Sequence, residues 1–134
     1  MDRYQELRRV FDESPYARLL GMHVEDLSEG YARVRMAMQP AYLNFAGRAH
    51  GGLVASLADQ AFACATNTLP HTYFAVQFNI NFVAAPSENG VLVAEGRVVH
   101  GGRSIAVCEM IVREEDNRLI ARATGTVAAM ERRG

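Results

Sequence analysis

The chain has little of what marks specialised classes of protein. It has only two cysteines, Cys64 and Cys108, and both fall within apolar patterns without the spacing of metal ligands. That usage disfavours a structural disulfide and a metal site. No apolar run at either end is long and uncharged enough to predict a signal or membrane segment, so we expect a cytoplasmic protein. The net charge is −1 and the arginines are spread along the chain, which argues against a nucleic-acid partner.

The remaining composition is that of an ordinary globular protein, with 49% apolar and 22% charged residues. A chain of 134 residues can build a real core but is too short for two domains. No linker, low-complexity tract or internal repeat divides it. We therefore expect one domain over residues 1–134.

The first part of the chain predicts helices followed by a strand. The segment Asp2–Glu13 is charged and compatible with a helix. Ser14 and Pro15 are typical of a helix N-cap and first turn, and Gly21 is typical of a helix end. Residues 31–38 alternate between apolar and basic or small side chains, which predicts a half-buried strand.

The segment from about Gly51 to Leu69 is apolar around nearly its whole circumference and rich in small residues. This pattern predicts a helix surrounded by protein and closely approached by a sheet, with Pro70 ending it. Strands with hairpin-type turn residues between them are expected afterwards, and short turns force antiparallel neighbours. The expected strands are residues 74–82, 91–99, 104–113 and 118–129. One apolar helix and a long antiparallel sheet predict an α+β domain with the sheet curled around the helix.

Asp59 is the most informative residue of this helix, because it is the only Asp, Glu, Lys or Arg between Arg48 and Glu88. An ion without partners in apolar surroundings is costly, so the carboxylate must be compensated, neutralised or used. On a helix Gly52 and Asp59 share a face about 10 Å apart along the axis. The plain alternative is a buried structural carboxylate bonded to Ser56 or to a backbone group.

His50, Gly51 and Gly52 open the same helix. The first amides of a helix lack internal partners and carry partial positive charge, and glycines leave a ligand free to approach them. Such donors polarise a carbonyl and hold a developing oxyanion, an effect worth about 3–4 kcal/mol per donor. Asp59 is a candidate general base or nucleophile. Because Gly51 and Asp59 are separated along one helix, the hypothesis requires a homodimer that brings the Asp59 of a second copy to Gly51.

The pattern Asn44-x5-His50-Gly51-Gly52-x6-Asp59 resembles that of the hotdog-fold acyl-CoA thioesterases, and Asp59-x-Ala61-Phe62-Ala63-x-Ala65-x-Asn67 resembles their phenylacetate-pathway (PaaI-type) branch. The resemblance covers nearly the whole chain. It implies a hotdog fold, with a curled antiparallel sheet around a long central helix and a short N-terminal helical segment. It also implies hydrolysis of a coenzyme A thioester without a further cofactor, by a homodimer within a homotetramer.

The resemblance also implies roles for individual residues. Asp59 would be the base or nucleophile, the Gly51 N–H would bind the thioester oxygen, Asn44 would orient water or the carbonyl, and His50 would support the loop. Substrate contacts would come from Gly52 and from a turn that is similar to the segment holding the coenzyme A tail in relatives. That turn contains Gly102, Arg103 and Ser104, and an arginine suits phosphates.

Several alternatives stay open at this point. Some relatives have a serine or threonine in the strand after the helix, where this chain has Ala75, so that help is absent or comes from Gln77 or Asn79. The acyl group is undetermined between an aryl group such as phenylacetyl and a short or medium chain. A hydratase or dehydratase on the same ligands is a rival, and so is a non-catalytic acyl-CoA binding module. Outside the family, Asn44 would be a turn former and Arg103 a solvated hairpin charge.

Overall fold

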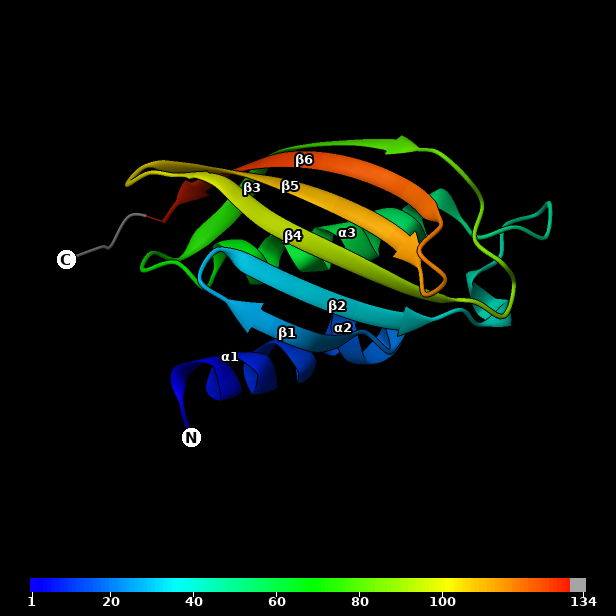
Figure 1. The fold of residues 1–134 in the computed structure, drawn as a ribbon, viewed down its shortest axis with the longest axis horizontal. Helices are drawn as coiled ribbons and strands as arrows, with labels where there is room; N and C mark the ends of the chain where they lie inside the picture. Colours follow the sequence, from blue (N-terminus) through cyan, green and yellow to red (C-terminus); the bar gives the residue numbers. More distant parts are fainter. Residues whose placement is uncertain (131–134) are drawn as a thin grey trace.

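A curled antiparallel sheet wraps around one long helix in the computed structural model, which describes residues 1–130 (Figure 1). This arrangement confirms the predicted α+β hotdog fold. The elements in chain order are α1 (Arg3–Asp12), α2 (Pro15–Leu20), β1 (His23–Ser28), β2 (Tyr31–Ala37), a 3-10 turn (Pro40–Tyr42), α3 (Gly51–Thr66), β3 (Tyr73–Phe82), β4 (Val91–Gly101), β5 (Ile105–Glu114) and β6 (Leu119–Ala129). No helix among these described residues is long and apolar enough to cross a membrane.

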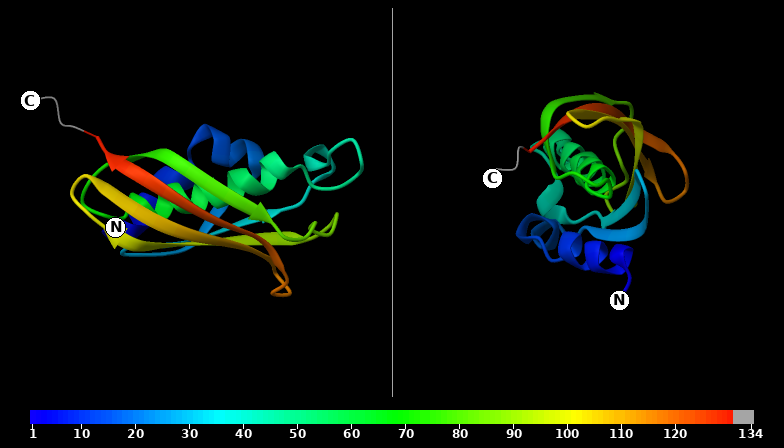
Figure 2. Two further views of the ribbon diagram at one scale, coloured as in Figure 1. Left: turned by 90° about the horizontal axis from the view of Figure 1, so that it is seen from above. Right: turned by 90° about the vertical axis from the view of Figure 1, so that its left-hand side faces the viewer.

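The six strands form one sheet in the order β1-β2-β4-β5-β6-β3, and every neighbouring pair is antiparallel. Hairpins join β4 to β5 and β5 to β6, as the turn residues predict. α3 and β3 lie between β2 and β4 in the chain, and β3 returns to the far side of β6. β3 is therefore an edge strand, with β1 at the opposite edge. Figure 2 shows α3 lying within the curl of this sheet.

α3 packs closely on the sheet because its residues are small. Leu57, Ala58 and Ala61 have no exposed surface. A Cβ at Gly96 of β4 would stand 2.7 Å from the backbone oxygen of Ala61, a distance that real Cβ atoms do not adopt. The helix backbone thus touches the strand backbone here, and glycine is required for that approach.

α3 ends at Thr66, three residues before the predicted end at Leu69. Side-chain hydrogen bonds to carbonyl oxygens near the C-terminal end of α3 account for its earlier end. The Thr66 hydroxyl donates to the Phe62 oxygen at 2.9 Å, and the Asn67 amide donates to the Ala63 oxygen at 2.9 Å. Serine, threonine and asparagine favour helix ends for this reason.

The N-terminal helices lie against the β1 side of the sheet (Figure 1). α1 begins at a capping box between Asp2 and Gln5, and α2 ends at Gly21 in the left-handed conformation, as the sequence predicts. β1 was not predicted. Its two buried residues, Val24 and Leu27, are three positions apart because the register to β2 shifts between Val24 and Asp26. A bulge of this kind hides the period of two from the sequence.

Candidate active site

One face of α3 stays open in the single chain. Gly52, Asp59 and Ala63 are exposed and Ser56 is half-buried, whereas the remaining circumference is largely buried. The prediction of a helix covered on all sides is therefore wrong for one protomer. Gly52, Ser56 and Asp59 of this open stripe are residues that the sequence places on a common helix face. An exposed stripe on α3 is a surface that a ligand or a second copy can reach.

The Asp59 carboxylate has no hydrogen-bond or ion-pair partner within residues 1–130. Ser56 does not bond to it: the Ser56 hydroxyl donates to the Gly52 oxygen at 2.8 Å and lies 2.8 Å from the Tyr16 hydroxyl. Asp59 is exposed, yet its surroundings displace part of its hydration, and this desolvation raises the pKa of the carboxyl above its usual value. An unpaired carboxylate with a raised pKa is a better proton acceptor than an ordinary one.

The loop before α3 positions Asn44 and His50. The Asn44 side-chain oxygen accepts from the amides of Ala46 at 2.9 Å and Arg48 at 3.2 Å, while its side-chain nitrogen has no partner in the described part of the chain. His50 is the N-cap of α3, and its Nδ1 accepts from the Gly52 amide at 2.9 Å. A ring nitrogen that accepts carries no proton, so in this arrangement Nδ1 is the acceptor of the cap and Nε2 faces away from it.

The first amide of α3 is left over for a ligand. The Gly52 N–H is taken by His50, whereas the Gly51 N–H donates to no group in residues 1–130. Gly51 lines a groove of about 380 Å³ together with Asn44, Arg48 and Val54. The far wall comes from Phe82, the last residue of β3, and from residues 83–86 after it. The groove thus presents a free N–H at the positive end of a helix beside a free side-chain amide.

The groove brings Asn44 and Gly51 together, His50 caps α3 next to Gly51 without lining the groove, and Asp59 does not line it either. Asp59 lies eight residues along α3, about 12 Å at the helical rise. Arg103 and Ser104 lie farther still, in an open pocket with His71 and Thr72 beside the other end of α3. Gly102 precedes these residues without lining the pocket, and its carbonyl accepts from the Tyr73 hydroxyl at 3.0 Å. One chain therefore holds the predicted site as three separate parts.

Ala75, where some relatives have a serine or threonine, lies on the opposite face of β3 from Gln77 and Asn79, the residues considered as its replacement. Ala75 pairs with the buried Val127 and so faces α3. A register shift between Ala75 and Gln77 follows, and Gln77 and Asn79 pair with Thr126 and Thr124 on the convex face. Their side chains therefore point away from the α3 side of their own chain.

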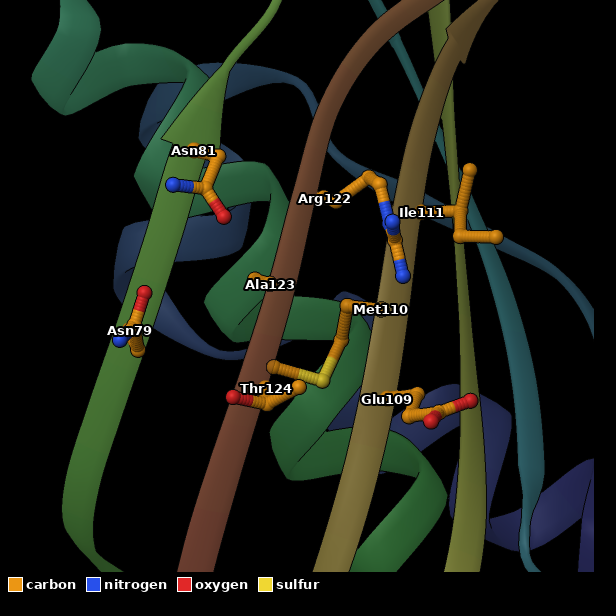
Figure 3. A pocket seen from close by; sticks show the side chains of 8 residues that line it. All are labelled: Asn79, Asn81, Glu109, Met110, Ile111, Arg122, Ala123 and Thr124. Carbon is orange, nitrogen blue, oxygen red and sulfur yellow. The ribbon is translucent and has the colours of Figure 1, made fainter.

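A shallow pocket of about 160 Å³ on the convex face contains Asn79 (Figure 3). Asn79 and Asn81 extend from β3 beside Thr124 and Arg122 of β6 and Glu109 of β5, with α3 behind the strands. The sheet thus separates this polar pocket from Gly51 and Asp59.

Comparisons with known proteins show the family to which this fold belongs. Residues 46–121 match the family model of the Thioesterase superfamily. A protein of Archaeoglobus fulgidus with an esterase assignment is 40% identical over 109 residues, which cover 81% of this chain and 71% of that one. The acyl-coenzyme A thioesterase PaaI of Escherichia coli is 28% identical over 118 residues, 88% of this chain and 84% of that one.

Solved structures extend the likeness over nearly the whole fold. The E. coli PaaI structure, from the phenylacetic acid degradation operon, superposes with a TM-score of 0.91 at 26% identity, covering 96% of this chain and 93% of that one. A hypothetical thioesterase protein from Streptococcus pneumoniae, solved with coenzyme A, gives a TM-score of 0.79 at 27% identity, covering 84% and 88%. The chain therefore belongs to the Thioesterase superfamily. The PaaI-type resemblance is confirmed, and with it the enzyme class, an acyl-CoA thioesterase.

Proposed function

We propose that the protein hydrolyses acyl-CoA thioesters at a site shared by two copies of the chain, with Asp59 of one copy facing Asn44 and Gly51 of the other. The observation that carries this proposal is the free N–H of Gly51 in a groove that its own Asp59 does not line. Neither half is sufficient for the reaction. A second copy supplies the missing carboxylate without any change in the fold.

The edge strand β3 supports the pairing of two copies. Phe74, Val76 and Phe82 are each about half exposed, at 50%, 55% and 55%. An apolar edge strand with free backbone groups is an aggregation hazard unless it is covered or paired. Antiparallel pairing of β3 with its copy about a twofold axis completes both edges at once.

The same pairing would join the parts of the site that lie far apart in one chain. Antiparallel strands place the Phe82 end of one β3 beside the Tyr73 end of the other. The pocket with Arg103 and Ser104 adjoins the Tyr73 end, and the groove with Gly51 adjoins the Phe82 end. The phosphates of coenzyme A would then meet the Arg103 of one copy while the thioester lies at the Gly51 of the other. We extend the proposal to a cytoplasmic homotetramer built from such dimers.

The chemistry follows from the charges. The thioester oxygen accepts a hydrogen bond from the Gly51 N–H, where the α3 dipole also favours the developing negative charge. Asp59 removes a proton from water as the water oxygen bonds to the acyl carbon, with Asn44 orienting the water or the carbonyl. The carbon–sulfur bond then breaks, the coenzyme A thiolate leaves and takes up a proton, and the free acid remains. His50 keeps the N-terminus of α3 in place.

Direct attack by the Asp59 carboxylate, through a transient anhydride, uses the same groups. A single turnover in ¹⁸O-labelled water distinguishes the two routes. The label enters the released acid if water attacks the thioester. If an anhydride forms and water opens it at the Asp59 carbonyl, the first acid released is unlabelled and the label stays in the Asp59 side chain.

The acyl group proposed is an aryl group such as phenylacetyl, or a short or medium chain, by likeness to PaaI. A hydroxyl on β3 is not required in this proposal. The streptococcal thioesterase was also solved with an aspartate and, sixteen residues later, a threonine each replaced by alanine. In the present chain, Ala75 stands at the same separation from Asp59.

The test is the release of coenzyme A thiol, measured colorimetrically with a panel of aryl, short, medium and long acyl-CoAs, for the wild type beside Asp59→Asn. We expect hydrolysis to fall at least 10²-fold in the variant, the usual contribution of a positioned base, with circular dichroism unchanged. Wild-type turnover in the variant would exclude Asp59. Binding of acyl-CoA without thiol release from any substrate would favour the binding module, and hydration of an enoyl-CoA would favour the hydratase.

A further inference from the structure

The β3–β4 connection forms one wall of the groove that contains Gly51. Val83, Ala84, Ala85 and Pro86 line it opposite the start of α3. These residues adopt no regular secondary structure. A wall without ladder hydrogen bonds keeps its shape only if other groups hold it, and any substrate in the groove must contact it.

A buried carboxylate on β5 holds this wall from behind. Glu114 is 7% exposed, and within residues 1–130 it is the one buried residue with a charged side chain. Its carboxylate accepts hydrogen bonds from the Ser87 amide and from the Ser87 hydroxyl, the latter at 3.2 Å. The Glu114 carboxylate therefore reaches out of its own hairpin to the loop that follows β3.

Arg118 on the same hairpin forms, together with Glu114, a clamp on the groove wall. Its Nη2 donates to the Glu114 carboxylate at 2.7 Å and to the Ala85 oxygen at 2.6 Å. The hairpin closes without these side chains, because the Glu114 amide donates to the Arg118 oxygen and the Asn117 amide to the Glu114 oxygen. The ion pair thus serves the groove wall rather than the turn on which it lies.

Backbone hydrogen bonds anchor only the ends of the β3–β4 connection. The amides of Val83 and Ala84 donate to the Ile120 oxygen at 2.8 and 3.2 Å, and at the other end the Gly90 oxygen accepts from the Met38 amide at 2.9 Å. Between these points, side chains of the β5–β6 hairpin hold the connection: Arg118 donates to the Ala85 oxygen and Glu114 accepts from the Ser87 amide.

Glu114 and Arg118 form the clamp as an ion pair of a carboxylate and a guanidinium. Burial raises the pKa of the Glu114 carboxyl, but the Ser87 hydrogen bonds and the Arg118 guanidinium outweigh it and leave the pKa below its usual value. A buried carboxylate without such partners would be costly, and removing its partners leaves a charge uncompensated. The carboxylate and the loop amide therefore depend on one another.

We propose that Glu114, together with Arg118, is a positioning residue for the thioester groove. It fixes Ala85 and Pro86 against the space opposite Gly51 and so sets the KM and the selectivity among acyl-CoAs, without taking part in the chemistry. This inference rests on the proposed function, because the groove is taken as the substrate site.

The test compares kcat and KM for the acyl-CoA panel in the wild type, Glu114→Ala, Glu114→Gln and Arg118→Met. The matched control is Glu115→Gln, since Glu115 is an exposed neighbour that pairs with Arg35 on the convex side. We expect Glu114→Ala to raise KM about tenfold, to leave kcat within about threefold, and to reduce the preference for the best substrate. Glu114→Gln should recover part of the loss, because its amide oxygen can still accept from Ser87. The control should match the wild type.

Hydrogen exchange separates positioning from general destabilisation. The amides of residues 84–90 should exchange faster in Glu114→Ala while those of α3 and β4 keep their protection. Unchanged KM and selectivity in a folded Glu114→Ala would overturn the inference, and so would a loss of kcat alone. If Glu114→Ala fails to fold, Arg118→Met, altered at an exposed side chain, decides by the same criteria. If the wild type hydrolyses no thioester, the proposed function fails, and loop exchange with acyl-CoA affinity still tests the clamp.

Discussion

The ring of Phe82 lies against the α-carbon of Gly51, with its Cζ 3.4 Å from the point where a Cβ on residue 51 would stand. This is ordinary van der Waals contact, and Gly51 does not have a positive φ. Neither crowding nor backbone conformation therefore demands glycine here. What glycine does provide is an unobstructed approach to the free N–H at the start of α3.

Gly51→Ala should accordingly fold as well as the wild type or slightly better, because alanine stabilises a helix relative to glycine by about 0.5–1 kcal/mol. Its kcat/KM should fall, because the new methyl group would stand between the amide and the ring of Phe82. Thermal unfolding and thiol release, measured on the same preparation, check both parts. A variant with full activity would remove Gly51 from the substrate site.

Asp59→Asn should change the pH dependence of stability. The pKa of Asp59 is raised in the fold by desolvation, so the ionised form is disfavoured relative to the unfolded chain. That cost is present above the folded pKa and disappears as pH falls below the unfolded value near 3.9. Because asparagine is neutral throughout, the variant should melt at or above the wild-type temperature at pH 7 and converge with it below about pH 4.

The control for this measurement is Glu29→Gln, which changes an exposed acid in the β1–β2 turn. If the wild type instead melts at a higher temperature than Asp59→Asn at pH 7, the Asp59 carboxylate has a stabilising partner in solution.

Gly96→Ala should destabilise the fold by about 1–3 kcal/mol, the usual cost of overpacking a core. Its Cβ would stand 2.7 Å from the Ala61 backbone oxygen, which cannot move aside as a flexible side chain can. Chemical denaturation measures the loss, with Gly51→Ala as the glycine substitution that has room. Equal stability of Gly96→Ala and the wild type would contradict the close packing of α3 on β4.

Much of the fold follows from local patterns. The alternation in β2, the turn residues and the small residues of α3 each predict their element within a few residues. Two of the sheet's register shifts are the exceptions. The one in β1 spaces Val24 and Leu27 three apart, and the one in β3 places Ala75 rather than Val76 on the face of Phe78. An extra residue in a strand is set by pairing with a neighbour, which a single segment does not reveal.

The parts of the candidate site can be proposed from the sequence, but their distribution over the fold cannot. Helical geometry alone separates Gly51 from Asp59, and the sequence motif gives Asn44 and His50. That His50 occupies the Gly52 amide, and so leaves Gly51 as the free donor, depends on the side-chain conformation of the cap. The roles of Glu114 and Arg118 were not predicted, since they act on a loop some 30 residues earlier through the sheet order.

Val76→Lys should yield a monomer. Val76 is 55% exposed at the bulge of the edge strand, and a lysine there blocks edge-to-edge pairing, as charged residues do on natural edge strands. Light scattering after size-exclusion chromatography measures the mass, and thiol release measures the activity. We expect both the dimer and hydrolysis to be lost while circular dichroism is kept. A fully active monomer would show that one chain holds a complete site.

The central claim is that each site combines Asp59 of one copy with Asn44 and Gly51 of another, and subunit mixing tests it most directly. Asp59→Asn and Asn44→Ala, each inactive alone, are unfolded and refolded together in equal amounts. In a mixed dimer one site has both substitutions and the other has neither, so random pairing should restore about a quarter of the wild-type activity. If the two sets of residues act within one chain, every site in the mixture is defective, and the absence of any recovery in proven mixed dimers would contradict the account.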